Sequence, residues 1–546
     1  MYSTSEDCYE RQQLISQNYQ TFRSLVAQAE GFAQRGHFNM AAIYADMADE
    51  YASWMGHCGL FVSPELEHIL LTIGQKAIKN SQPLSRNQLC DKKPRNILHV
   101  VYSVWSIGGH SRLLWRWIQQ DAERSHSVVL TRMSVADVPE ALSNAVYASR
   151  GKLYALNETV GNFLSLAERL QQIANSADVV VLHTGYDGCI PVIAFANREQ
   201  SPPIIYVNHA DERFWTGISI SDVVANLRET GMRLSQNRRG VELDRNLIIP
   251  TIIEVTKRET SQTEAKRQLK INESTIVLLS IARAVKYRTS DGTTFADAHI
   301  AFLKSHENAM LIVVGPGDDE DWSAVIQQTQ GRIRVYGETN NTAVFYQAAD
   351  IYIDSFPFVS ITSLLEAGIY GVPLVSRYPY SSDKCEIFGA DMPGLTGNLI
   401  QVKTLEEYTK VLDHLVEDEK FRLSLGEKTK QQIEKIHTGD NWQKSLDAIY
   451  ERAIDLPRMV LLSELKDEVS ISEPDVLLQK ICPFQKADLD ELILKRARLM
   501  PLNKRFLIWF KQIRKGKLGR MGNISLLFPS WIYVRIASLV KSRSSN

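Results

Sequence analysis

The sequence predicts an α/β protein made of two consecutive domains behind a small helical region. Three observations support this prediction. The chain has 546 residues, which is too long for a single ordinary hydrophobic core. Short apolar runs alternate with helical stretches from about residue 96, and the alternation starts again after Pro250. Hydrophobic residues make up 44% of the chain and charged residues 23%, as in folded globular proteins, which argues against long disorder.

The first region, residues 1–90, has apolar residues at helical spacing and no strand pattern. QNYQTFRSLVAQAEGFAQRG and FNMAAIYADMADEYASWMG are separated by Arg35, Gly36 and His37, which predicts two antiparallel helices. Such a pair resembles one tetratricopeptide-like hairpin, but a single copy is a weak signal. We therefore expect a plain helical cap, with the hairpin as the alternative.

Residues 91–250 form the first predicted α/β domain. The runs predicted as buried strands are ILHVVYSV, HSVVLTRM, KLYALN, DVVVLHTG, PIIYVNHA and NLIIP. The gaps between most of these runs can hold a helix. A parallel sheet is therefore expected, because parallel strands need such crossovers.

Residues 251–456 form the second predicted α/β domain. Its predicted strands are TIVLLSIAR, MLIVVGPG, RIRVYG, DIYIDSF and VPLVSR, and its predicted helices include TEAKRQLK, WSAVIQQT, TAVFYQAA and SLLEAGIY. Open parallel sheets bind ligands at the carboxyl ends of their strands. We expect a ligand there, in the cleft between the two domains.

Residues 457–546 are predicted as a linker and a basic amphipathic tail. From Leu492 to Asn546 there are 13 Lys and Arg and no Asp or Glu, although the net charge of the chain is only -1. NKRFLIWFKQIRKGKLGRMG and LLFPSWIYVRIASLVKSR mix apolar side chains with cations. This mixture suits a helix lying in a membrane surface, and equally a helix packed on the preceding domain. The near-zero net charge predicts no nucleic-acid partner.

Cysteine usage and the first residues bear on location. The six cysteines are scattered, with neither the spacing of a zinc site nor the density of a disulfide scaffold. The opening MYSTSEDCYERQQL lacks the basic and then apolar run of a signal peptide, and no segment is long enough to span a membrane. We expect a cytoplasmic protein, peripheral at the inner membrane face if the tail binds lipid.

The first candidate site is the turn SIGGH, directly after the predicted strand ILHVVYSV. Gly108 and Gly109 let the backbone approach a ligand, and the N–H groups of the helix that starts here favour an anion or a sugar oxygen. The alternative is a turn that only shapes the connection, with His110 as its cap.

A second candidate lies at the end of the run PIIYVNHA. His209 could donate to a sugar hydroxyl or transfer a proton as a neutral imidazole, with Asp211 fixing its orientation. A purely structural histidine is the alternative. The position at the carboxyl end of a strand favours function.

The second domain places cations just beyond its first strand. Arg283, Lys286 and Arg288 lie in LLSIARAVKYRTS, where they can stabilise a diphosphate leaving group without a metal. A solvated basic loop is the alternative. The acidic run 318–321 leads into a predicted helix and more simply complements its dipole, so we predict no metal site.

The segment ADIYIDSFPFVSITSLLEAGIYGVPLVS is the most informative. Ser360, Thr362 and Ser363 begin a predicted helix whose N–H groups and hydroxyls could hold phosphate oxygens. Glu366 follows one turn later, and its two oxygens could accept the hydroxyls of a ribose. The alternative is an acid that only favours the start of its helix.

From Asn96 to Ile454 these motifs resemble the GT-B glycosyltransferases, in which two Rossmann-like domains face each other across a cleft. The resemblance to the group related to glycogen and sucrose synthases is carried by Gly108-Gly109, Arg283 with Arg288, Gly315-Pro316-Gly317, Glu366-Ala367-Gly368, Gly371-Val372-Pro373 and the closing helix NWQKSLDAIYERAI. Tyr336 of RIRVYG is included among the expected donor-site residues.

One position departs from that group. A second Glu usually stands eight residues before the ribose-binding one, and here that position is Phe358. The segment also resembles the inverting protein O-GlcNAc-transferase group, through Asp354, Thr362-Ser363, Glu366 and the position of Lys286. The resemblance therefore leaves retaining and inverting chemistry both open.

The resemblance implies transfer of a hexose or N-acetylhexosamine from a UDP- or GDP-linked donor to a hydroxyl of a polysaccharide, lipid or protein acceptor, with no metal or other cofactor. His110, His209 and Asp211 are the expected catalytic residues. Two alternatives stay open, because one fold serves many functions. The first is another enzyme on this fold, a nucleotide-sugar epimerase or a phosphorylase, and the second is a non-catalytic scaffold.

Overall fold

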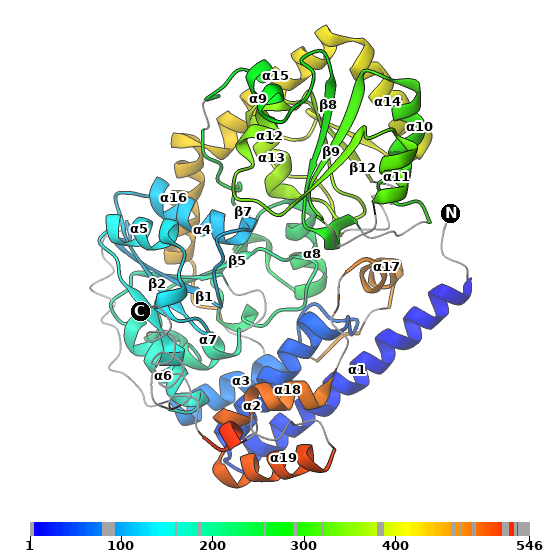
Figure 1. The fold of residues 1–546 in the computed structure, drawn as a ribbon. Coiled ribbons are helices and arrows are strands. Elements are labelled where there is room, and N and C mark those ends of the chain that lie inside the picture. Colours follow the sequence, from blue (N-terminus) through cyan, green and yellow to red (C-terminus); the bar gives the residue numbers. More distant parts are fainter. Residues whose placement is uncertain are drawn as a thin grey trace, which may run out of the picture.

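The computed structural model has two lobes, each built on a parallel sheet, above a layer of helices (Figure 1). It describes residues 5–78, 93–158, 161–183, 188–255, 258–287, 292–317, 322–378, 387–459, 466–469, 471–482, 484, 488–515, 524–528 and 532. The predicted fold class, two α/β domains behind a helical region, is confirmed.

The first sheet has seven parallel strands in the order β3-β2-β1-β4-β5-β6-β7. The strands are β1 (Asn96–Val101), β2 (Ser125–Leu130), β3 (Leu153–Ala155), β4 (Val179–His183), β5 (Ile204–Asn208), β6 (Val223–Asn226) and β7 (Asn246–Ile248). Six of them coincide with predicted runs. The sequence did not predict β6, because the strand has only four residues, the last of them Asn226, and periodicity needs a longer window.

Helices cover both faces of this sheet (Figure 1). They are α4 (Gly109–Gln120), α5 (Glu140–Ala148), α6 (Phe163–Ala174), α7 (Cys189–Ala194) and α8 (Glu229–Arg239). A later helix, α16 (Gly439–Asp455), returns from the second lobe, and its Trp442 and Tyr450 join the core around Trp117 of α4. The helix predicted to close the family's fold thus packs on the first sheet.

The second sheet has six parallel strands in the order β10-β9-β8-β11-β12-β13. They are β8 (Ile276–Ile281), β9 (Ala309–Gly315), β10 (Ile333–Gly337), β11 (Ile351–Ile353), β12 (Leu374–Arg377) and β13 (Leu399–Val402). The helices of this lobe are α9 (Gln262–Gln268), α10 (Asp297–Ser305), α11 (Ser323–Gln328), α12 (Ala343–Ala348), α13 (Ile361–Ile369), α14 (Leu405–Glu417) and α15 (Glu419–His437). The short strand β13 was not predicted.

The helical region consists of α1 (Ser5–Gln34), α2 (Phe38–Glu50) with a π-helical turn at Tyr51–Met55, and α3 (Pro64–Ala77). It shares one hydrophobic core with the first sheet. The contact is close at Gly74 of α3, where an added Cβ would lie 2.3 Å from the carbonyl oxygen of Ile193 in α7. These helices therefore form a cap on the first domain, as expected.

Beyond α16 the chain returns to this cap through α17 (Glu473–Ile481), α18 (Leu489–Arg496) and α19 (Leu502–Arg514) (Figure 1). Arg496 is buried, and it donates to Asp46 and to Glu50 of α2 at 2.5 Å each. Arg132 of the first domain donates to the same Asp46 at 2.8 Å. Packed helices therefore occupy part of the range predicted as linker and tail, while most of LLFPSWIYVRIASLVKSR lies outside the described residues.

Among the described residues, no helix combines the length and the apolar content needed to cross a bilayer.

The ion pair between Arg496 and Asp46 is expected to anchor the C-terminal helices. Arg496→Leu removes the cation and leaves buried carboxylate charge, which costs about 3 kcal/mol of unfolding free energy. Lys495→Leu, next to it, removes the partly exposed pairs with Glu50 and Glu491 and should change stability by less than about 1 kcal/mol. Urea unfolding of both variants tests this, and equal midpoints would contradict the anchoring role.

Candidate donor and acceptor sites at the interdomain cleft

The helix starts of α4 and α13 face each other across the two domains. An added Cβ on Gly109, the first residue of α4, would lie 2.3 Å from Thr362 Oγ1 on α13. Gly108, the N-cap of α4, has a φ of 128°, which favours glycine. The predicted glycine turn and the predicted phosphate-binding helix therefore meet in one crevice.

Asp354 orders the loop that leads into α13. Its carboxylate accepts the Ser360 N–H at 2.9 Å and the Ser376 hydroxyl at 3.1 Å. The Ser360 hydroxyl in turn donates to Ser363 at 3.2 Å. Burial raises the pKa of Asp354 to about 6, against the lowering effect of the Ser360 N–H and of Lys286. Thr362 and Ser363 are only partly buried at this helix start.

Lys286 lies beside the same loop, in the 3₁₀ turn Ala284–Tyr287. Its Nζ donates to the carbonyl of Val359 at 2.8 Å and lies 5.1 Å from the centre of the Phe358 ring. Burial lowers the pKa of Lys286 to about 8, although Asp354 opposes the shift. Lys286 and Thr362 are therefore close to one loop, and not on opposite surfaces.

The structure describes only one of the other two predicted cations. Arg283 is exposed, and Arg288 lies outside the described residues. The acidic run 318–321 is also outside them.

Glu366 is buried and held by the first domain. Arg112 Nη1 donates to both its oxygens at 2.8 and 2.9 Å, Arg116 Nη2 donates at 3.0 Å, and the Tyr346 hydroxyl lies at 3.3 Å. Sequence reasoning missed both arginines. The signal was present, because residues four apart in SRLLWRWIQQ share one face of a helix.

A cavity of about 520 Å³ opens beside Glu366, between α4 and α5 of the first domain and α12 and α13 of the second. Its lining includes Arg112, Trp115, Arg116, Glu140, Glu254, Asn340, Asn341, Tyr346, Glu366 and Tyr370. Apolar rings and convergent polar groups are typical of small-ligand sites.

Of the predicted donor-site residues that the structure describes, only Glu366 lines this cavity. Gly315, at the end of β9, has a φ of 122°, and an added Cβ there would lie 2.0 Å from the carbonyl oxygen of Ala282. Close strand packing therefore accounts for this glycine. Tyr336 is partly buried in β10 and packs edge-on against Phe345, with ring centres 5.1 Å apart.

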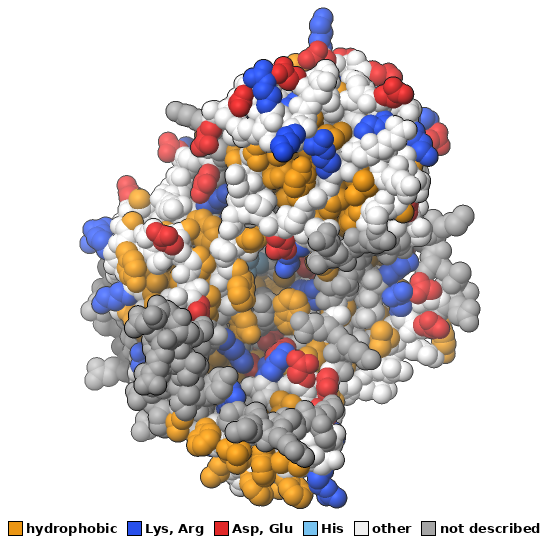
Figure 2. Space-filling model, in the orientation of Figure 1, with side chains coloured by type: hydrophobic (Ala, Val, Ile, Leu, Met, Phe, Trp, Pro, Cys, Tyr) orange, Lys and Arg blue, Asp and Glu red, His pale blue; other side chains and the backbone are white. Residues whose placement is uncertain are grey.

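The predicted histidines meet on the first-domain side of the cleft, and Figure 2 shows histidine atoms deep in the hollow between the lobes. The rings of His110 and His209 stack with centres 4.1 Å apart and planes within 6°. His209 Nε2 is 2.9 Å from Nδ1 of His183, a residue that was not predicted from the sequence. Burial lowers the pKa of His110 to about 4 and that of His209 well below its usual value, so both are neutral at pH 7.

Asp211 does not orient His209 as the sequence suggested. Its carboxylate binds Arg228 at 2.5 and 2.6 Å, and the partner of the imidazole is His183. The physical reason is that the buried guanidinium fork of Arg228 matches both oxygens of a carboxylate. Asp211 thus holds the start of α8.

Ring nitrogens of His110, His183 and His209 lie within 4.8 Å of one another in the described part of the chain. A metal ion must lie in the plane of each imidazole that binds it. The parallel rings of His110 and His209 have no common plane, and His183 and His209 share a hydrogen bond. This arrangement suits proton sharing rather than coordination.

Comparison with known proteins gives one family match, to part of the chain, and several similar solved structures. Residues 261–432, which contain the Lys286 turn and α13, match the model of the glycosyl transferases group 1 family. No curated protein matches the chain.

Three solved structures illustrate the similarity. A glycosyltransferase from Rickettsia africae has 11% identity and a TM-score of 0.51, covering 66% of this chain and 99% of that one. HepE from Anabaena, in complex with UDP and glucose, has 14% identity and a TM-score of 0.49, covering 66% and 99%. A mutant O-GlcNAc transferase from Thermobaculum terrenum has 15% identity and a TM-score of 0.46, covering 81% and 85%.

The predicted resemblance is therefore confirmed by the family match in the second domain and by two facing parallel sheets. The chain has the GT-B fold, and residues 261–432 in its second domain are similar to the group 1 glycosyl transferases.

Proposed function

We propose that the protein transfers a hexose or N-acetylhexosamine from a UDP- or GDP-linked donor to an acceptor hydroxyl. The supporting observation is the meeting of three features at one cleft. These are the N-terminus of α13 at Thr362, the cation Lys286, and the neutral histidine pair of the first domain. The first two suit a diphosphate, and the third suits proton transfer.

In the proposed donor complex, the diphosphate lies at the free N–H groups of α13, next to Lys286 and Arg283. These positive groups neutralise the charge that develops on the leaving group, the role a metal ion has in other transferases. We therefore propose that transfer needs no metal or other cofactor. The nucleoside lies in the cavity beside Glu366 and Tyr346.

Glu366 has a double role in this proposal. Its carboxylate already accepts three hydrogen bonds from Arg112 and Arg116. A ribose diol competes for the same oxygens, which have about four lone-pair sites. Donor binding therefore loosens the link between the domains, and product release restores it.

The acceptor hydroxyl lies on the first-domain side, next to His209 and His110. The acceptor is a polysaccharide, a lipid or a protein. An epimerase on this fold would change the donor sugar without any acceptor, and a scaffold would bind the nucleotide without releasing sugar. Mass spectrometry of the donor after incubation with and without candidate acceptors separates the three.

The first test concerns donor binding. UDP or GDP is expected to raise the melting temperature, because a ligand that binds only the folded state stabilises it. Glu366→Ala removes a charged acceptor for the ribose and should weaken binding about 10- to 100-fold, so that the shift disappears. Glu264→Ala, a half-exposed acid on α9, is the matched control and should keep the full shift. No shift with any nucleotide would contradict the proposal.

The second test uses the pKa of Lys286, which is about 8 in the free protein. A bound diphosphate raises that pKa, so the lysine contributes fully to affinity below pH 8 and its contribution is lost as pH rises above 8. UDP affinity measured by calorimetry should fall between pH 8 and 9.5, by up to about tenfold per pH unit.

Lys286→Arg carries a charge that does not titrate in this range, so its UDP affinity should stay constant with pH. Uridine, which has no phosphate, is the ligand control. An unchanged pH dependence in the arginine variant would remove Lys286 from the site.

We further propose that α19 binds an anionic lipid surface. Figure 2 shows an apolar patch over this part of the molecule. Its residues are between 43% and 59% exposed, namely Leu502, Phe506, Leu507, Phe510 and Ile513. Exposed Lys504, Lys511 and Arg514 lie on the same helix. Apolar side chains bordered by cations are typical of helices that lie in the plane of a membrane.

The third test is sedimentation with vesicles. The wild-type protein should bind vesicles of phosphatidylserine and phosphatidylcholine, and binding should weaken with salt. Phe506→Ser with Phe510→Ser removes about 3 kcal/mol of apolar contact and should abolish binding. Tyr147→Ser, an exposed aromatic of the first domain, is the control. Equal binding of both variants would exclude α19 as the contact.

A further inference from the structure

Four histidines form a continuous hydrogen-bonded row inside the first domain. His209 Nε2 is 2.9 Å from His183 Nδ1, His183 Nε2 is 3.0 Å from His99 Nδ1, and His99 Nε2 is 2.9 Å from His126 Nδ1. His126 Nε2 ends the row at Asp121, 3.1 Å from its carbonyl oxygen and 3.2 Å from its carboxylate. The row links the cleft, at the carboxyl ends of the strands, to the amino end of β2.

Strand register explains why these rings touch. His126 of β2 is paired with Ile97, two residues before His99 on β1, and His183 of β4 is paired with Val101, two residues after it. Steps of two keep all three side chains on one face of the sheet. The row therefore crosses three neighbouring strands diagonally, from their amino ends to their carboxyl ends.

The row is dry. His99, His126 and His183 are completely buried, and Trp117 of α4 packs edge-on against His99 and His183, with ring centres 5.8 Å apart in both cases. Burial lowers the pKa of His99 and of His183 well below the usual value. A neutral imidazole has one N–H to donate and one lone pair to accept, so rings in this state can form a continuous row.

Asp121 gives the row its direction. Both oxygens of residue 121 near His126 are acceptors, so Nε2 of His126 donates to them, and in the neutral tautomer that this requires Nδ1 accepts. The same requirement passes along His99, His183 and His209, each with its N–H toward Asp121. The last lone pair is then on His209 Nδ1, which has no hydrogen-bond partner among the described residues and lies on the partly exposed ring at the cleft.

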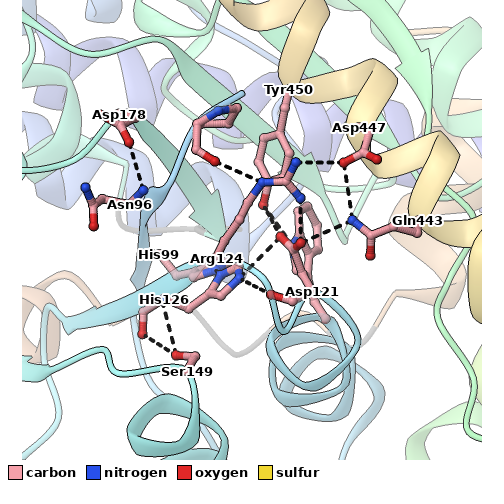
Figure 3. Close-up of polar contacts among 12 residues, drawn as sticks. Asn96, His99, Asp121, Arg124, His126, Ser149, Asp178, Gln443, Asp447 and Tyr450 are labelled. Carbon is pink, nitrogen blue, oxygen red and sulfur yellow. Dashed lines mark hydrogen bonds and ion pairs between the residues drawn. The ribbon is translucent and has the colours of Figure 1, made fainter. Parts of the chain in front are cut away.

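The Asp121 end of the row is a charged anchor (Figure 3). Burial alone would raise the pKa of Asp121, but His126 and Arg124 outweigh it, so the pKa is lowered and the carboxylate stays ionised. Arg124 donates to Asp121 at 2.5 Å and to Asp447 of α16 at 2.8 Å. The Tyr450 hydroxyl lies 3.3 Å from the same carboxylate.

We infer that this row is a proton relay that makes His209 Nδ1 the general base for the acceptor hydroxyl, with Asp121 as its fixed counter-charge. The inference rests on the proposed transferase function and adds the positioning residues His183, His99 and His126. None of these three touches the cleft contents directly. They act through His209.

The proton balance is as follows. The acceptor O–H bond breaks, and its proton joins His209 Nδ1 while the acceptor oxygen bonds to the sugar and the diphosphate leaves. The Nε2 proton of His209 moves to His183 Nδ1, and equivalent shifts follow to His99 and to His126. His126 then carries the positive charge, 3.2 Å from the Asp121 carboxylate. The reverse shifts return the proton to the cleft after product release.

Nitrogen-15 NMR of histidine-labelled protein tests the relay without any activity. The expected result for the full chain is the Nε2–H tautomer at His209, with Nδ1 unprotonated. His99→Phe keeps a ring but interrupts the row, so His209 should become a mixture of both tautomers. An Nδ1–H tautomer at His209 in the wild-type protein would overturn the relay, whether or not the protein proves to be a transferase.

Kinetics separate orientation from charge. With the sugar nucleotide that the thermal-shift screen selects, His99→Phe should lower kcat on the order of 100-fold and leave donor affinity unchanged. Asp121→Asn should lower kcat while keeping the tautomers, because the backbone carbonyl of residue 121 still accepts from His126. Wild-type kcat in both variants would overturn the relay.

A matched buried histidine controls for lost packing. His299 of the second domain is equally buried and bonded to Phe295 and Tyr408, so His299→Phe should lose stability but keep kcat. A metal is the competing explanation for the cluster at the cleft. One equivalent of zinc, retained by the purified protein and lost on His183→Phe, would overturn the relay, because coordination uses the nitrogens that the row needs.

Discussion

The close approach of α4 and α13 is the constraint on which the site depends. Gly109 leaves no space for a side chain opposite Thr362. One and two turns further along α4, Arg112 and Arg116 hold Glu366, which lies one turn beyond Thr362 on α13. A buried carboxylate needs such partners, because an unpaired charge in this setting would cost several kcal/mol. The same contact brings the start of α13, the proposed phosphate-binding helix, close to the start of α4, which carries His110.

In the proposed donor complex, donor binding and domain position are parts of one equilibrium. The carboxylate that suits a ribose is also the one that ties the domains together, so a ligand that binds there changes the interdomain link. α16 supplies a second, permanent link, because Trp442 and Tyr450 are buried against the first sheet although their helix follows the second domain. Motion is therefore expected at the Glu366 side of the cleft, with α16 as the fixed side.

In the proposed relay, strand register gives the hydrogen bonds of the histidine row one common direction. Residues offset by two on neighbouring parallel strands lie on one face, and an ionised carboxylate at one end leaves each neutral ring a single tautomer. Asp121 also binds α16 through Tyr450, so the helix that joins the domains supports the far end of the row. Core packing and the orientation of the cleft histidine thus have a common structural basis.

The sequence by itself determined the fold class, most strands and the family resemblance, because buried strands, glycine turns and helix starts are local patterns. It also placed His209 and Lys286 at or just beyond strand ends, and His110 and Thr362 at helix starts, on the side of parallel sheets where ligands bind. Only the tertiary structure decided the partners. Asp211 pairs with Arg228, and His209 is hydrogen-bonded to His183. Glu366 pairs with Arg112 and Arg116. The two members of each pair are not neighbours in the sequence. Their hydrogen bonds form only where packing brings the two side chains within hydrogen-bond distance, and local sequence patterns do not show this.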